Sequence, residues 1–512
     1  MTAATPNVDA GILGIDAAAG RDVNISDVTV THRGKIIQHI AAVYNIQEAA
    51  VGSEPITASL KDRFRRLLEQ RHVLFGGRGA ELQRLNSFLV QRPSGYLFLT
   101  SRSGFGKTAL LANWVKSLRD QHEHVCYHFI SRDDGSDVAG ADFTLRNLCQ
   151  QLVAFHELTG QLPSTTDVMR SLYPQLLGVP PAQGQKLIVI LDGLDEAVDW
   201  TLGPDLFPRQ LPRGVFVVFS AREIAGRDWL TEFDLGADAE VVELQTLGTM
   251  EIAHLLRSVG PRVSAWADDP RSLQAVWKIS GGDPFYLRYL VEDIRDVPIT
   301  SVEQLERHTT AAGKAPGQRG LKTYLDKWWA EVSKVAGEPA VYNLLGYLLV
   351  SKGPLTRDEL IQISDTDALN GAVFERVIQQ TARYVLGDEK TGYRFCHSRF
   401  RDYISQQRIK EPEQQPYRRA LIDYCGRWCQ HKSQYARAHY AEHLREAGQL
   451  DSLCSLVDNP KWHETQMEAD PSGDPFRSDV RRAWALCQVR DSAAIKEGKS
   501  APNLCRDRKS VV

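Results

Sequence analysis

Short apolar runs alternate with amphipathic stretches between residues 75 and 244. Each apolar run is followed by polar or glycine-rich sequence, which predicts a strand, and the stretches between repeat apolar residues at helical spacing, as in Leu145, Leu148 and Leu152. The run 187–191 is wholly apolar and ends in an acid, as expected for a strand buried on both faces of a parallel sheet. This alternation predicts a doubly wound α/β domain. The predicted strands are 96–100, 125–130, 187–191, 215–219 and 240–244.

After this domain the sequence predicts helices, interrupted by one hairpin. The hairpin strands 383–386 and 393–396 flank a Gly-Asp-Glu-Lys-Thr-Gly turn and follow a series of helices, which is the order of a winged helix. A linker rich in Gly, Pro and Lys, at 311–319, precedes that series. The predicted domains are 74–245 (α/β nucleotide-binding), 246–312 (helical lid), 313–410 (winged helix) and 411–490 (C-terminal helices).

The sequence at the two ends of the chain predicts less regular structure than the middle. Apolar and polar residues alternate at period two over 21–31, and β-branched residues continue to residue 46, so residues 1–55 predict a short strand-rich or adaptor region. Residues 56–73 have apolar positions at helical spacing and predict a linker helix. Residues 491–512 are polar and basic, which favours a disordered tail.

Composition restricts the classes of protein to consider. Of 512 residues, 43% are hydrophobic and 24% charged, and the net charge of −3 gives no electrostatic reason to expect nucleic acid or an anionic membrane as partner. No apolar run approaches the roughly 20 residues of a membrane span. The eight cysteines include no CxxC pair, and Cys425, Cys429 and His431 lack a second ligand pair for zinc. We expect buried thiols and a cytoplasmic protein.

The most informative stretch is SRSGFGKTALL, residues 101–111, between a predicted strand and a predicted helix. Strand, glycine-rich turn, Lys-Thr and helix form a P-loop, in which backbone N–H groups and the helix N-terminus surround phosphates. Lys107 can reach the β- and γ-phosphates, and the Thr108 hydroxyl can ligate Mg²⁺. Ser101 stands where the full pattern has Gly. The predicted nucleotide contacts here are Ser103, Gly104, Phe105, Gly106, Lys107, Thr108 and Ala109.

Charged residues follow two further predicted strands. Asp192 ends the apolar strand and can hold Mg²⁺ opposite Thr108, while Asp195 or Glu196 can polarise an attacking water. Arg222 follows the strand 215–219, where a cation can sense a γ-phosphate. Parallel strands end at one edge of a sheet, so these groups predict one site with the P-loop.

Together these motifs resemble the STAND class of P-loop NTPases, and the NACHT branch more than the NB-ARC branch. LDGLDEA at 191–197 looks like the NACHT acidic motif, and HFISRDD at 128–134 is also similar to NACHT proteins. FGGRGAEL at 75–82 resembles the segment that lines the adenine site, which makes Gly77 and Arg78 candidate nucleotide contacts.

The resemblance extends beyond the α/β domain, to about residue 403. The Gly-Asp-Pro ending at Pro284 looks like the motif whose proline packs against adenine, and HSRFRDYI at 397–404 is similar to the motif whose histidine, here His397, contacts the β-phosphate of ADP. The resemblance implies an ADP/ATP-controlled signalling ATPase that uses Mg²⁺, hydrolyses ATP slowly and forms homo-oligomers when activated. It also implies an effector or sensor partner that the sequence does not identify.

Two alternatives remain open. An AAA+-like, DNA-associated ATPase would use its winged helix to read DNA, but the candidate recognition helix 372–381 carries one Arg and one Glu instead of a basic face. A nucleotide-stabilised scaffold without turnover is the second alternative, suggested by Ser101 and by terminal modules that are missing or unrecognisable.

Overall fold

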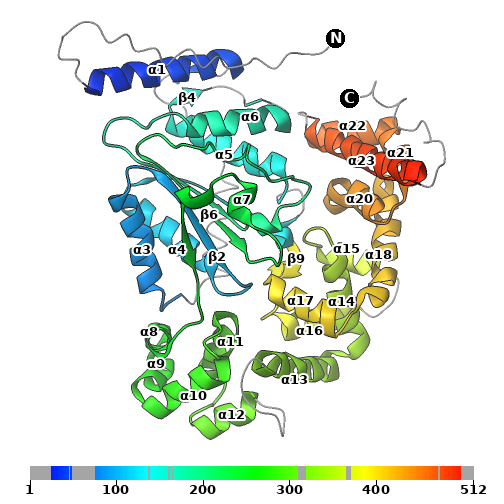
Figure 1. Cartoon of the computed structure of the whole chain (residues 1–512). Helices are drawn as coiled ribbons and strands as arrows, with labels where there is room; N and C mark the ends of the chain where they lie inside the picture. Colours follow the sequence, from blue (N-terminus) through cyan, green and yellow to red (C-terminus); the bar gives the residue numbers. More distant parts are fainter. Residues whose placement is uncertain are drawn as a thin grey trace, which may run out of the picture.

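A five-stranded parallel sheet in the order β3-β5-β6-β2-β7 organises the first half of the chain (Figure 1). This computed structural model describes residues 25–44, 47–48, 75–135, 139–159, 162–163, 165–309, 319–364, 369, 371–470 and 473–496. All five predicted strands are confirmed, with ends that differ by a few residues at most. They are β2 (Gly95–Ser101), β3 (His124–Phe129), β5 (Leu187–Asp192), β6 (Val215–Arg222) and β7 (Ala239–Glu243).

Each face of the sheet buries a separate set of side chains, because successive residues of a strand point to opposite faces. Leu97 and Leu99 of β2 pack with α3 (Gly79–Gln91) and α4 (Lys107–Asp120). Tyr96 and Phe98, their neighbours in the strand, belong to a second core on the other face. That core is formed with α5 (Ala141–Phe155), α6 (Thr166–Leu177) and α7 (Trp229–Glu232). The doubly wound α/β fold is therefore confirmed.

The N-terminal segment forms a helix, α1 (Ile25–Tyr44), so the predicted strand over 21–31 is wrong for its described residues. Ile37 and Ile40, three residues apart, lie on one helix face and are 6% and 1% exposed in the same core as α6. Burial of this face outweighs the weak strand preference of the β-branched residues. A short strand, β1 (Gln47–Glu48), then pairs antiparallel with β4 (Leu158–Thr159), which the sequence did not predict.

The predicted helices beyond the sheet are confirmed. The lid contains α8 (Thr249–Val259), α9 (Pro261–Asp268), α10 (Pro270–Ser280), α11 (Pro284–Asp296) and α12 (Val302–Thr309). The winged helix contains α13 (Arg319–Ala336), α14 (Glu338–Val350), α15 (Arg357–Ile363), α16 (Gly371–Thr381), the hairpin β8 (Val385–Asp388) and β9 (Gly392–Phe395), and α17 (Ser398–Gln407). One continuous core joins both parts, so they pack as a unit.

Helices α18 to α23 complete the described chain; α18 packs against α14 and α15, and α20, α22 and α23 lie beside α5 and α6 (Figure 1). Helix α23 continues to Lys496, so the predicted disorder from residue 491 is wrong for its first six residues. The remaining tail (497–512), the predicted linker helix (56–73) and most of the linker 311–319 lie outside the described residues. No helix of the described chain has both the length and the apolar character to cross a bilayer. The C-terminal helices are α18 (Glu411–Gly426), α19 (Trp428–His431), α20 (Gln434–Glu446), α21 (Leu450–Val457), α22 (Pro460–Ala469) and α23 (Asp474–Lys496).

Candidate functional site

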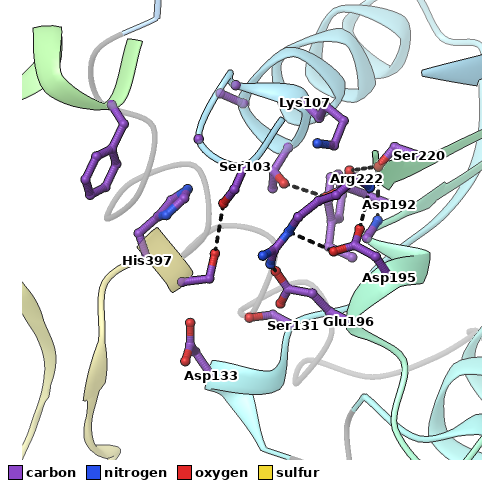
Figure 2. Close-up of a pocket in the computed structure, with 18 of the residues that line it drawn as sticks. Ser103, Lys107, Ser131, Asp133, Asp192, Asp195, Glu196, Ser220, Arg222 and His397 are labelled. Carbon is purple, nitrogen blue, oxygen red and sulfur yellow. Dashed lines mark hydrogen bonds and ion pairs between the residues drawn. The ribbon is translucent and has the colours of Figure 1, made fainter. Parts of the chain in front are cut away.

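A cavity of about 180 Å³ lies at the carboxyl ends of β2, β5 and β6, where a parallel sheet presents its ligand site. Figure 2 shows the P-loop and the acidic side chains facing one another, with His397 on the opposite side. Segments far apart in sequence supply the walls: the P-loop, the loop after β5, the start of α11 and the junction of β9 with α17. Among the predicted contacts, the cavity wall includes Ser103, Gly104, Gly106, Lys107, Thr108, Ala109, Asp192, Asp195, Glu196, Arg222, Pro284 and His397.

The loop between β2 and α4 has the backbone shape of a phosphate-binding loop. Gly104 and Gly106 have φ of 80° and 93°, which L side chains rarely adopt, so glycine is required at both. Helix α4 begins at Lys107, and no side chain caps it at Gly106. The first N–H groups of the helix therefore remain available as donors beside the cavity, as a phosphate requires.

Ser101 is the last residue of β2 and contacts Lys107 directly. The Lys107 ammonium donates to the Ser101 carbonyl oxygen at 3.0 Å and to its hydroxyl oxygen at 3.1 Å. The φ of Ser101 is not positive, so the backbone at this position does not require the glycine of the full pattern. Burial lowers the pKa of Lys107, and the nearby Asp195 and Asp192 carboxylates oppose this shift.

Thr108 and Asp192 form the predicted Mg²⁺ pair. The Thr108 hydroxyl donates to Asp192 Oδ2 at 2.7 Å, and the Ser220 hydroxyl donates to Asp192 Oδ1. Burial raises the pKa of Asp192, although the hydrogen bonds from Ser220 and Thr108 oppose the shift. Hydroxyl and carboxylate oxygens are the hard ligands that Mg²⁺ takes, and this ion usually keeps several waters besides. The pair therefore fits Mg²⁺. Within the described chain no group of three or more His, Cys, Asp or Glu side chains could hold a metal ion, and this includes Cys425, Cys429 and His431.

Arg222 binds both acids that follow Asp192. Its Nε lies 2.7 Å from Asp195 Oδ2, and its guanidinium also donates to Glu196 (Figure 2). Burial raises the pKa of Glu196, and the Arg222 charge opposes this. The three predicted catalytic residues thus lie together in the cavity wall, but the arginine is occupied by the two acids.

The lid and winged helix close the other side of the cavity. His397 lies at the N-terminus of α17, where its Nδ1 accepts the Arg399 N–H at 3.0 Å, and its ring is 4.6 Å from that of Phe285 in α11. The hydroxyls of Ser103 and Ser398 are 3.5 Å apart. Pro284 is the first residue of α11 and also lines the cavity. Pro284 and His397, the two predicted contacts from outside the α/β domain, therefore line the same cavity as the P-loop.

Gly77, Arg78 and Phe105 do not line this cavity. Arg78 is 5% exposed, and its guanidinium donates to the carbonyls of Phe105 at 2.9 Å and Gln245 at 2.8 Å. Gly77 has a φ of 76°, and a Cβ there would lie 2.6 Å from the Glu251 carbonyl oxygen. In this structure Arg78 thus joins the P-loop to the segment before the lid, and Gly77 allows a close approach of the lid.

Sequence reasoning missed several residues of this region. Arg399 of α17 forms an ion pair with Asp283, at 2.6 Å, beside Gly104. Arg401 and Arg394 form ion pairs with Asp133 at 2.6 Å and Asp134 at 2.9 Å. The only sequence signal was the high density of arginines between residues 394 and 401. The missed residues in the cavity wall are Phe129, Ile130, Ser131, Asp133, Gly193, Ser220, Phe285, Arg288, Cys396 and Ser398.

Comparisons with known proteins give partial matches. A family model described as "Nephrocystin 3, N-terminal" matches residues 81–207, which include the P-loop and the acidic loop. A comparison with curated proteins finds no match.

Several solved structures resemble this chain, with low sequence identity and low TM-scores. The Orc1 protein of Aeropyrum pernix in complex with DNA is 16% identical, covers 67% of this chain and 96% of its own, and has a TM-score of 0.31. The Cdc6p of Pyrobaculum aerophilum is 13% identical, covers 66% and 86%, and has a TM-score of 0.30. The Walker-type ATPase paby2304 of Pyrococcus abyssi is also 13% identical, covers 64% and 95%, and has a TM-score of 0.28. Scores this low carry no functional conclusion. The parallel sheet, the P-loop and the helix that begins at Lys107 identify the α/β domain as a P-loop NTPase fold.

Proposed function

We propose that the protein is a STAND-type, NACHT-like ATPase that acts as an ADP/ATP-controlled switch. The observation that carries the proposal is the shared wall of the cavity. P-loop, acidic loop, lid and winged helix all meet there, so one nucleotide could contact every part at once. A ligand can bias a conformational equilibrium only through contacts that differ between the two states, and a wall built from separable parts provides such contacts.

The residues of the site have separate roles in this proposal. Backbone N–H groups of the P-loop and the Lys107 ammonium bind the phosphates, and Thr108 with Asp192 holds Mg²⁺, which supplies neutralisation of phosphate charge. Asp195 or Glu196 orients the attacking water. Arg222 is held by both acids, so movement of its guanidinium toward a γ-phosphate would compete with these ion pairs, which supports slow, regulatory hydrolysis.

The closed arrangement corresponds to the ADP-bound resting state. Arg401–Asp133 and Arg394–Asp134 join the winged helix to the α/β domain, and their side chains are between 6% and 24% exposed. Partly buried pairs of this kind are costly to break one partner at a time. ATP would favour an open form in which the ring of His397 leaves the nucleotide and neighbouring copies assemble with an effector or sensor protein.

The rival readings have less support. In a DNA reader, α16 would enter the major groove, but it carries Glu375 beside Arg376 and no basic face. A scaffold without turnover was suggested by Ser101, whose backbone and side chain fit the loop without strain. We also propose a cytoplasmic location, because the seven described cysteines are thiols and six of them are buried.

The deciding experiment compares purified protein loaded with Mg-ADP and with Mg and a non-hydrolysable ATP analogue by size-exclusion chromatography. The proposal expects a monomer with ADP and a larger species with the analogue. Identification of the co-purified nucleotide and a turnover assay with and without duplex DNA accompany it. Turnover that requires DNA would favour the DNA-associated ATPase, and bound nucleotide without any turnover would favour the scaffold.

A further inference from the structure

A second and larger cavity, about 580 Å³, lies between the α/β domain and the C-terminal helices. Its walls come from the N-terminal ends of α5 and α6 on one side and from α20, α22 and α23 on the other. Its size falls within the roughly 300–1,000 Å³ of small-molecule sites, and domain interfaces are a common place for such sites. Nothing in the proposed nucleotide switch uses it.

Four arginines line this cavity, two from α20 and two from α23. Arg445 NH2 lies 3.3 Å from one carboxylate oxygen of Asp199, and Arg482 Nε lies 3.1 Å from the other. Asp199 enters the cavity from the loop after β5, three residues beyond Glu196. Arg437 differs from both, because its guanidinium forms no ion pair with any residue in the described ranges. Asp199 therefore already bridges two of the four arginines, and Arg437 is a further cation in the same wall.

Two of the other acids in the wall, Asp479 and Asp142, have hydrogen-bond donors of their own, and Asp479 shares Arg482 with Asp199. Asp479 is buried and accepts hydrogen bonds from Trp462 at 3.0 Å, Gln466 at 3.2 Å and Arg482 at 3.0 Å. Asp142 accepts from Thr166 at 3.1 Å and from Arg146, which lies outside the wall, at 3.2 Å. Asp470 follows the C-terminus of α22. The two well-bonded carboxylates are matched by donors of their own, so Asp199 is the acid that a ligand could replace.

We propose that this cavity binds a small anionic molecule whose phosphate or carboxylate group replaces Asp199 on Arg445 and Arg482 and engages Arg437. Guanidinium groups bind both kinds of anion through paired N–H donors. The N-terminal turns of α5 and α6, which also form the wall, favour negative charge in the same place. A bound ligand would therefore free the loop that carries Asp195 and Glu196 from one of its anchors.

Calorimetric titration of the full chain tests this directly, with inorganic pyrophosphate and citrate as separate probes. The protein carries Lys107→Ala, so that the P-loop does not dominate the signal and the result does not depend on nucleotide binding. We expect binding of at least one probe at one site per chain, and addition of Arg437→Ala should weaken it by at least about tenfold, the loss of a charge-assisted hydrogen bond. Addition of Asp199→Asn should strengthen it several-fold, because the competing charge is removed and Asn tolerates the positive φ of 50°.

The matched control is Arg376→Ala, an exposed arginine of α16 that does not line this cavity, and it should leave the affinity unchanged. Binding of pyrophosphate alone identifies a phosphate ligand, and binding of citrate alone identifies a carboxylate ligand. The inference is overturned if neither probe binds, or if Arg437→Ala and Arg376→Ala bind the probe equally well.

Discussion

The Lys107 ammonium is bound by Ser101, the residue that departs from the P-loop pattern, through both its carbonyl and its hydroxyl oxygen. A phosphate would compete with these contacts for the ammonium of Lys107. Ser101→Ala removes one of them and leaves the backbone unchanged. We expect this variant to bind ATP a few-fold more tightly, since a neutral acceptor contributes roughly 1 kcal/mol. Fluorescent-nucleotide titration measures the change, and a loss of affinity above tenfold would contradict it.

Lys107→Ala should abolish measurable ATP binding, because it removes the charge that meets the β- and γ-phosphates. The control is Lys116→Ala, which removes an exposed lysine from the same helix, α4. The same titration measures both. ATP affinity that is equal in the two variants would remove the P-loop from the proposed site.

His397 combines two roles that substitution can separate. Asparagine can still accept the Arg399 N–H as an N-cap, whereas alanine cannot. We expect His397→Asn and His397→Ala to release ADP faster to a similar extent, since both lose the ring next to Phe285. His397→Ala should lose about 1 kcal/mol more unfolding free energy than His397→Asn, because only asparagine keeps the cap. Stopped-flow release and denaturant unfolding give the two readouts, and an unchanged release rate in both variants would count against the clamp.

Gly281 and Gly282 offer a matched pair within the segment that resembles the STAND proline motif. Both have positive φ, 60° and 71°, so alanine is strained at either. At Gly282 a Cβ would also lie 2.2 Å from the Leu247 carbonyl oxygen, whereas nothing lies within 4 Å at Gly281. We expect Gly281→Ala to cost about 1 kcal/mol of unfolding free energy and Gly282→Ala roughly 2 kcal/mol more, as in overpacked cores. Equal losses in urea unfolding would exclude the close contact with Leu247.

Titration of the buried Asp479 should make the free energy of unfolding depend on pH. Burial raises its pKa to about 6, so the folded state holds a proton that the unfolded state has released between about pH 4 and 6. Wild-type stability should therefore fall as pH rises through this window, by up to about 1.4 kcal/mol per pH unit from this one group. Asp479→Asn does not titrate, so its stability relative to wild type should improve from pH 4.5 to 7. A relative stability that stays constant with pH would refute the assignment.

The sheet and the P-loop could be predicted because their patterns are local. The strand 187–191 is apolar on both faces, and the glycines and Lys-Thr of residues 104–108 require only their own loop. Helix α1 could not be predicted in this way, because burial of Ile37 and Ile40 depends on α6, which is more than a hundred residues away.

Contacts between distant segments also explain why the arrangement of the candidate site could not be predicted. The acids, Arg222 and His397 were predicted individually, but the engagement of Arg222 by both acids depends on how β5 and β6 end relative to each other. Arg78 resembled a nucleotide contact, and the structure instead directs its donors to two backbone carbonyls. Side-chain hydrogen bonds of this kind are set by tertiary packing, which a linear pattern does not contain.

The position of α1 bears on how a minimal nucleotide-binding fragment should be cut. A fragment that starts at Phe75 contains every residue of the P-loop, yet it removes Ile37 and Ile40 from a core that also holds Tyr96 and Phe98 of β2. It also removes β1, the pairing partner of β4. Such a fragment would expose a hydrophobic surface beside α6 and be prone to aggregate. A fragment for crystallisation or ligand screening should therefore include α1 and β1, well upstream of the first nucleotide-binding motif.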